Sequence, residues 1–483
     1  MAYHDLSEFL AYLHKRGVLR HIEVEVSRDL EITTIAARTA QMTGGGPALL
    51  FENVTGFRMP VLLNGWSTPQ RMAWALGLTS LDQLTGHYRE RLNANLTGSN
   101  DRLVQLGANS DLVRFAPRQV KTGICQEVVV EAQNTNFDLL PTLQHHPNAP
   151  YRVLTDAQIF YRDPHSHKTR LALGDLSVTS LKRAILTPHP FCLAAPLFDA
   201  ADTKFAIGMR LPVACVWGGD PTLLFAALAP LPPLLDELTL AGYLRRSRIE
   251  TVACKTSDLE VPAQAEIVLE GFLIRTPTTK IPNTRSGFQH NVEAVWDLEL
   301  TTLTTRHQPI FTTTALGTPY AESGLLKAIE RALLPLLQQS TPAIVDLSLP
   351  SAGLLHNLAI VTIEKRYAGQ AQQVMNALWG SEWLKTLKTL VVVDADCDIQ
   401  NFAQVVWRVA ASLNPKHDLL TLPGSLSIFD HTAFGSFGSK VGIDATRKLP
   451  GESLGVGDNV RVIEIDLHTR EMVNKKWPSY GID

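Results

Sequence analysis

Hydrophobic and polar positions change pattern twice along the chain. At the N-terminus, apolar residues recur at helical spacing between Leu6 and Leu13. A strand-like alternation over residues 22–26 and a second helical pattern over residues 30–41 follow. These patterns predict a small α/β domain over residues 1–117.

The middle of the chain, residues 118–320, carries short apolar runs separated by Pro and Gly, with few helical patterns. The expected strands cover residues 128–131, 157–161, 213–217, 249–254, 265–274 and 294–303, and the expected helices cover residues 223–228 and 234–241. Many strands with turn signals between them predict a β-rich barrel domain.

The last part, residues 321–483, returns to alternating helices and strands. Helical patterns cover residues 325–338, 369–378 and 399–411, and strand patterns cover residues 343–349, 358–364 and 389–394. This alternation predicts a second α/β domain.

Composition narrows the class of protein. The chain has 483 residues, too many for one hydrophobic core, and a net charge of -3 gives no reason to expect nucleic-acid binding. The N-terminus has no basic region followed by an apolar run, and no apolar stretch is long enough to span a bilayer. The five cysteines are scattered without a Cys-x-x-Cys pair, which favours reduced thiols and a cytoplasmic location.

Six stretches, in order along nearly the whole chain, carry a resemblance to a known family. They are residues 45–53 (GGPALLFEN), 218–221 (GGDP), 237–242 (ELTLAG), 258–271 (DLEVPAQAEIVLEG), 361–369 (VTIEKRYAG) and 438–446 (GSKVGIDAT). Through them the chain resembles the UbiD-type decarboxylases, which use prenylated FMN. The resemblance implies an N-terminal α/β domain, a central split β-barrel of the FMN-binding type and a C-terminal α/β domain.

The family's catalytic residues match this chain poorly. One run of the family supplies a metal-ligating asparagine and an arginine. In this chain Ala172 and Ser177 stand at those two positions. The family's acidic run places Thr279 and Thr284 where the family has carboxylates, and no Asp or Glu occurs between residues 271 and 291. Because threonine hydroxyls do not ionise near neutral pH, the resemblance predicts a decarboxylase framework whose proton-handling groups are replaced by uncharged hydroxyls.

Two metal-binding positions of the family retain ligand residues. Glu237 matches the family's glutamate and His189 its histidine, so the resemblance implies a Mn²⁺ site that lacks one ligand. The alternative is a loop histidine and a helical glutamate that pairs with Arg245 or Arg246.

A run rich in hydroxyls and cations covers residues 177–183. Such a run suits a phosphate, because Lys and Arg replace the charge of the lost metal. The alternative is a solvated turn that leads into a helix. Lys280 and Arg285 add two more cations, which either favour an anionic ligand or lie exposed in a loop. The predicted cofactor-binding residues are Gly174, Ser177, Thr179, Ser180, Lys182 and Arg183.

Two functions follow from the resemblance. The first is a carboxy-lyase that acts on an aromatic or α,β-unsaturated acid with prenylated FMN. The alternative is a catalytically inactive UbiD-like subunit, or a flavin- or phosphate-binding protein, that accompanies an active paralogue. By analogy with the family we expect a homo-oligomer in either case.

Overall fold

The structure is a computed structural model that describes residues 3–96, 110–164, 166–192, 197, 205–231, 235–354, 357–433, 436–452, 463 and 465–481. Its helices are α1 (Leu6–Lys15), α2 (Glu31–Ala40), α3 (Pro69–Ala75), α4 (Asp82–Leu96), α6 (Thr222–Ala226), α7 (Glu237–Arg245), α8 (Ser323–Ser340), α9 (Gln370–Trp379), α10 (Phe402–Ser412) and α11 (Leu467–Lys476). None of the helices described here is long and apolar enough to cross a membrane.

The strands form four sheets. They are β1 (Leu19–Ile22), β2 (Ala48–Phe51), β3 (Val61–Leu63), β4 (Arg118–Gln119), β5 (Val128–Val130), β6 (Arg152–Arg162), β7 (Thr169–Ser180), β8 (Arg183–Pro188), β9 (Arg210–Trp217), β10 (Glu250–Ala253), β11 (Glu260–Pro262), β12 (Ile267–Asn283), β13 (His290–Thr305), β14 (Phe311–Thr312), β15 (Ile344–Ser348), β16 (Leu358–Ile363), β17 (Thr389–Asp394), β18 (Leu419–Ser425) and β19 (Phe437–Asp444).

The N-terminal sheet has the order β1-β2-β3-β14 and is covered by α1, whose apolar face is buried. The helix predicted between Leu6 and Leu13 is confirmed. The strand expected over residues 22–26 lies earlier, because β1 ends its parallel pairing with β2 where Ile22 meets Phe51. Val24 beyond it is 69% exposed.

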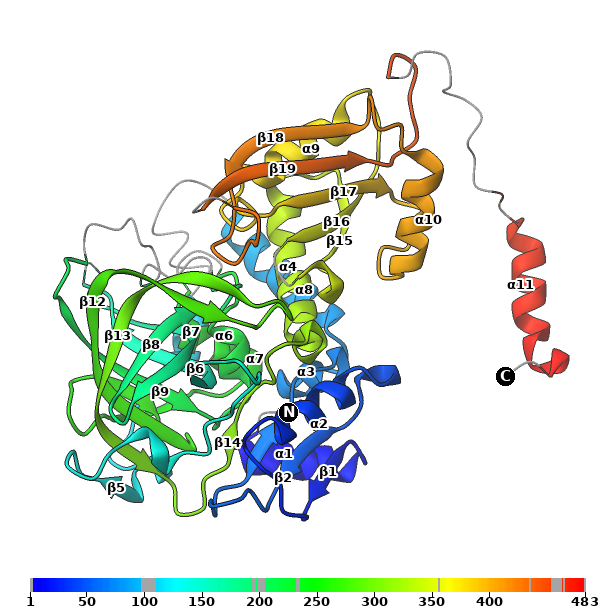
Figure 1. Ribbon diagram of the computed structural model, residues 1–483. Helices are drawn as coiled ribbons and strands as arrows, with labels where there is room; N and C mark the ends of the chain where they lie inside the picture. The colour runs from blue at the N-terminus through cyan, green and yellow to red at the C-terminus, as the bar shows by residue number, and fades with distance from the viewer. Residues whose placement is uncertain are drawn as a thin grey trace.

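The central sheet closes on itself. Its strands follow the order β12-β9-β6-β7-β8-β13, β12 pairs with β13 to complete the ring, and β5 adds to β13 (Figure 1). The strands predicted for this region all occur, although the one over residues 249–254 is β10 of a separate sheet with the order β11-β10-β4. The sequence patterns did not reveal the β7–β8 hairpin. The alternative of a turn that leads into a helix after residue 183 is wrong, because Arg183 begins β8 and pairs with Ser180 of β7.

The C-terminal sheet has the order β15-β16-β17-β19-β18, in which β16, β17 and β19 run parallel. Its first helix, α8, packs against α3 and α4 of the N-terminal region and lies between the barrel and the C-terminal sheet (Figure 1). A 3-10 turn, Pro319–Glu322, runs directly into α8. The three regions therefore meet around this one helix.

Candidate functional site

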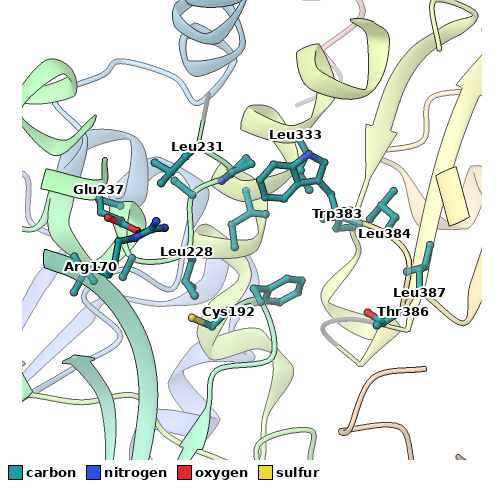
Figure 2. A pocket seen from close by; sticks show the side chains of 18 residues that line it. Arg170, Cys192, Leu228, Leu231, Glu237, Leu333, Trp383, Leu384, Thr386 and Leu387 are labelled. Atoms are coloured by element: carbon teal, nitrogen blue, oxygen red, sulfur yellow. Dashed lines mark hydrogen bonds and ion pairs between the residues drawn. The ribbon is translucent and has the colours of Figure 1, made fainter. Parts of the chain in front are cut away.

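A largely apolar pocket of about 220 Å³, here called the interdomain pocket, opens between the barrel and the C-terminal region (Figure 2). The loop after α6 supplies Leu228 and Leu231, α8 supplies Leu333, and the segment between α9 and β17 supplies Trp383 and Leu387. Apolar walls of this kind suit a flat, poorly hydrated ring system.

Among the described residues that line this pocket, only Arg170 and Glu237 carry a charged side chain. Nε and Nη2 of Arg170 lie 2.9 and 2.8 Å from Oε1 of Glu237. Glu237 is the first residue of α7, a helix that begins where the Asp236 carboxylate accepts from the Thr239 N–H. Burial raises the pKa of Glu237, and the Arg170 charge opposes that rise.

The alternative in which Glu237 pairs with Arg245 or Arg246 is wrong. Arg245 pairs instead with Asp220 at 2.9 Å, and Arg246 contacts His87. Cys192 also lines the pocket, but its thiol is buried and burial raises its pKa to about 12. The thiol is therefore protonated at neutral pH and is a weak nucleophile.

A second group of charges is fully buried beside the pocket. We call it the Arg285 cluster: Arg285, Asp156, Asp175, Glu322 and His189. Arg285 is 2% exposed, and its Nε and Nη2 lie 3.1 and 2.6 Å from the two carboxylate oxygens of Asp175. Nη2 also lies 3.1 Å from Oδ1 of Asp156, and Nη1 donates to Oε1 of Glu322.

A β-bulge places two of these carboxylates together. The register between β6 and β7 shifts between Leu154 and Ala157, opposite Asp175. Asp156 takes a left-handed backbone conformation there, with φ of 56°, and its N–H donates to Oδ1 of Asp175 at 3.1 Å. Like charges on neighbouring strands repel, so the position of Arg285 between the two aspartates is what makes this arrangement stable.

His189 joins the Arg285 cluster to the pocket wall. Its Nε2 lies 2.8 Å from Oε1 of Glu322, and its Nδ1 accepts from the Phe191 N–H at 3.2 Å. These bonds place a proton on Nε2, which faces Glu322. The Phe191 ring lines the interdomain pocket and lies 5.9 Å from the His189 ring.

The carboxylates of the cluster differ in acidity. Burial raises the pKa of Asp156, and the Glu322 and Asp175 charges add to that rise against the opposing effect of Arg285. Burial also disfavours the charged form of Glu322, but Arg285 and His189 outweigh it and lower its pKa to about 2. Asp156 thus holds a proton more readily than Glu322.

The two predicted metal ligands, His189 and Glu237, each have other hydrogen-bonding partners. Both ring nitrogens of His189 are engaged, and Glu237 is held by Arg170. Within the described part of the chain, one group of three possible ligands lies within 4.8 Å, namely Asp156, His189 and Glu322. Arg285 already supplies the positive charge at that place. The residues present therefore do not fit the implied Mn²⁺.

The predicted cofactor-binding run forms the β7–β8 hairpin outside the interdomain pocket. Lys182 donates to the Ala132 carbonyl at 2.7 Å, and Arg183 pairs with Asp297 and Glu299 at 2.6 and 3.0 Å. The Thr179 hydroxyl donates to the Arg183 carbonyl.

Two further residues of that run, Gly174 and Ser177, lie in the barrel wall. A Cβ at Gly174 would lie 2.6 Å from the Thr187 carbonyl oxygen, so this glycine permits close packing of β7 on β8. Ser177 and Thr284 line one small cavity of about 20 Å³ together with Asp175, while Thr279 is exposed elsewhere on β12.

The surroundings of Thr284 do not contain uncharged hydroxyls alone, contrary to the expectation from the sequence. Arg285 directly follows Thr284 in the chain, and it is neither exposed nor open to a ligand, because three carboxylates from other segments surround it. Lys280, by contrast, is exposed. One signal was available in the sequence: Asp156 and Asp175 interrupt apolar strands, and a buried charge requires a partner.

Comparisons with known proteins agree with this architecture. Three family models match, all described as 3-octaprenyl-4-hydroxybenzoate carboxy-lyase: the N-terminal domain over residues 10–87, the Rift-related domain over 118–319 and the C-terminal domain over 323–445. A protein of Archaeoglobus fulgidus, described as uncharacterized, is 35% identical over 99% of this chain and 98% of its own length.

Solved structures match over nearly the whole chain as well. The UbiD-class enzyme HmfF from Pelotomaculum thermopropionicum, in complex with FMN, is 25% identical with a TM-score of 0.77 and covers 98% of this chain and 100% of its own. Vanillic acid decarboxylase of Sedimentibacter hydroxybenzoicus in its closed form shares the fold at 23% identity and a TM-score of 0.80, over 99% of each chain.

Proposed function

Because the chain belongs to the UbiD family of carboxy-lyases, we propose that it is a carboxy-lyase of an aromatic or α,β-unsaturated acid that uses prenylated FMN. The interdomain pocket carries this proposal. It is apolar, it holds one cation, and it lies between the barrel and the C-terminal region. Its residues fit a flat ring with an anionic end.

The apolar side chains of the pocket would exclude water from a bound ring and acid. Leu228 and Leu231 form one wall and Trp383 stands opposite (Figure 2). A low local polarity strengthens the interaction of any charge within it. A prenylated flavin, when bound, supplies the electron sink for loss of carbon dioxide.

Loss of carbon dioxide leaves a carbon atom that must take up a proton, and the Arg285 cluster is suited to hold one. It places carboxyl groups beside an arginine, the same pairing of groups that the resemblance implies for the family. Phe191, which lines the pocket, has its ring 5.9 Å from the ring of His189 in the cluster. We propose that Asp156 takes the proton-holding role that Ser177, Thr279 and Thr284 cannot fill, while the ionised Glu322 holds Arg285 in place.

Co-expression with a flavin prenyltransferase tests the proposal. The purified protein should carry a yellow cofactor with the mass of prenylated FMN, and in D₂O it should release carbon dioxide from its acid and leave one deuterium on the ring or vinyl carbon that carried the carboxyl group. A colourless protein that binds neither FMN nor its prenylated form would refute the proposal.

One observation favours a second function, a flavin-binding but catalytically inactive subunit that accompanies an active paralogue. Every guanidinium nitrogen of Arg285 is already engaged by a carboxylate, so it is not available to a substrate. A protein that binds the flavin stably but catalyses neither exchange nor decarboxylation with any aromatic or unsaturated acid would support this alternative.

A further inference from the structure

Arg170 lies where the resemblance implies a metal ion. In that scheme a divalent cation joins Glu237 to the phosphate of the flavin, with an asparagine and a histidine as additional ligands. Here Ala172 offers no ligand atom, and His189 is bound to Glu322. The cation that contacts Glu237 is the Arg170 guanidinium, at 2.8 Å.

One edge of the Arg170 guanidinium contacts Glu237, and one nitrogen of the group faces away from that carboxylate. Nε and Nη2 face Glu237, whereas Nη1 makes no hydrogen bond to any residue that the structure describes. The side chain of Arg170 is 30% exposed and that of Glu237 is 7% exposed, and both line the interdomain pocket (Figure 2). A planar group with five donors can hold two anions on different edges.

We propose that Arg170 binds the anionic group of the pocket's ligand directly, with Glu237 as the residue that orients it, and that no metal ion takes part. The inference rests on the proposed function, so the anionic group is the phosphate of FMN. Glu237 and a phosphate would repel each other if nothing lay between them. Arg170 contacts Glu237 with one edge and leaves Nη1 to the phosphate, so it does the bridging that a divalent cation does elsewhere.

Two ligands that differ only in the phosphate isolate this contact. FMN and riboflavin carry the same ring, so the ratio of their dissociation constants measures what the phosphate contributes. We expect the full-length protein to bind FMN at least about tenfold more tightly than riboflavin, since a charge-assisted hydrogen bond is of that strength. The ratio should be the same in EDTA and in added Mn²⁺, and metal analysis should find no stoichiometric metal.

Substitutions at Arg170 should remove the preference for the phosphate. In R170M, FMN and riboflavin should bind alike, because the ring contacts remain and the cation is gone. R170K should keep part of the preference, since an ammonium is a cation without a second edge. In E237Q the preference should fall less than in R170M, because the guanidinium stays but is oriented less firmly.

Arg152 provides a matched control. Its Nε and Nη2 also lie on one carboxylate oxygen, Oδ1 of Asp29, at 3.1 and 2.7 Å, and its side chain is 35% exposed. Arg152 is not among the pocket residues. R152M should therefore bind both flavins as the parent protein does. Melting curves of each variant identify any that is unfolded, and R170K then carries the test if R170M fails to fold.

The outcomes separate the inference from the proposed function. If R170M keeps the preference for FMN, or if the preference requires Mn²⁺, the inference is overturned while flavin binding stands. Equal binding of FMN and riboflavin by the parent protein overturns it in the same way. If the parent protein binds neither flavin, both the inference and the proposed function fail.

Discussion

At the scale of single residues, the Arg285 guanidinium contacts Asp156, Asp175 and Glu322, all of them buried. Substituting it with Met should lower the free energy of unfolding by about 3–5 kcal/mol, because carboxylates would be left buried without a cation. The exposed pairs of Arg183 with Asp297 and Glu299 provide the control. R183M should cost no more than about 1 kcal/mol in the same denaturant titration.

A smaller loss at Arg285 than at Arg183 would contradict this account of the cluster. It would mean that the carboxylates find other partners when the guanidinium is removed.

The unequal acidity of the cluster predicts how stability depends on pH. Asp156 has a folded pKa above its ordinary value of 3.8, so its contribution is fully present below that pH and is lost as the pH rises through the folded pKa. Substitution with Asn removes this loss. The D156N variant should therefore gain stability relative to the parent protein as the pH rises from 4 to 8, as measured by denaturant unfolding at each pH.

Glu322 should show the opposite dependence. Its folded pKa of about 2 lies below its ordinary value of 4.5, so its contribution is present above pH 4.5 and is lost as the pH falls toward 2. E322Q should thus differ most from the parent protein at neutral pH and least near pH 2. Differences that do not change with pH for either variant would refute the assignment.

At the scale of elements, α8 depends on a close backbone approach. A Cβ at Gly324 would lie 2.2 Å from the Trp66 carbonyl oxygen and 2.4 Å from that of Thr68, whereas one at Gly86 in α4 would meet nothing within 4 Å. G324A should therefore destabilise the protein by about 1–3 kcal/mol. G86A should stabilise it by about 0.5–1 kcal/mol, since alanine favours a helix. Thermal unfolding of both variants checks the contrast.

The elements that the sequence predicted are those with a clear period. The helix covering Leu6 to Leu13 and the parallel strand over residues 389–394 both follow simple apolar patterns, and both occur. The β7–β8 hairpin was missed because β7 carries Gly174 and Asp175 within an apolar run and then several hydroxyls, which hid its alternation.

The candidate site was harder to predict because the residues that contact one another in it are far apart in the sequence. Asp156, Asp175, Arg285 and Glu322 are far apart along the chain and meet only through a β-bulge and the turn before α8. Periodicity gives no information about such meetings. The pairing of Glu237 with Arg170 has the same origin, since 67 positions separate the two residues.

At the scale of the whole molecule, the interdomain pocket takes its walls from the barrel and from the C-terminal region. A ligand that fills it should stabilise both together, by about 2.7 kcal/mol at one hundred times its dissociation constant. Saturating FMN should then slow amide exchange in β7 and in β17 alike. Protection confined to the barrel strands would show that the ligand binds elsewhere.

The same pocket gives a spectroscopic check. Trp383 stands in its wall, opposite Arg170 and Glu237 (Figure 2). FMN should quench part of the tryptophan fluorescence, and the W383F variant should lose that part while it still binds the flavin. Unchanged quenching in W383F would place the flavin away from this wall.

The crowding of Asp156, Asp175 and Glu322 around Arg285 also limits the mutational routes by which such a centre can arise. An aspartate acquired opposite another aspartate before the arginine was in place would destabilise the chain, because neither buried charge would have a cation beside it. An arginine acquired beside one existing acid would be tolerated, and each further acid could then be added to it. In a combinatorial library at these four positions, genotypes that carry two or three of the acids without the arginine should therefore be depleted among the survivors, whereas genotypes that carry the arginine with one or more acids should persist.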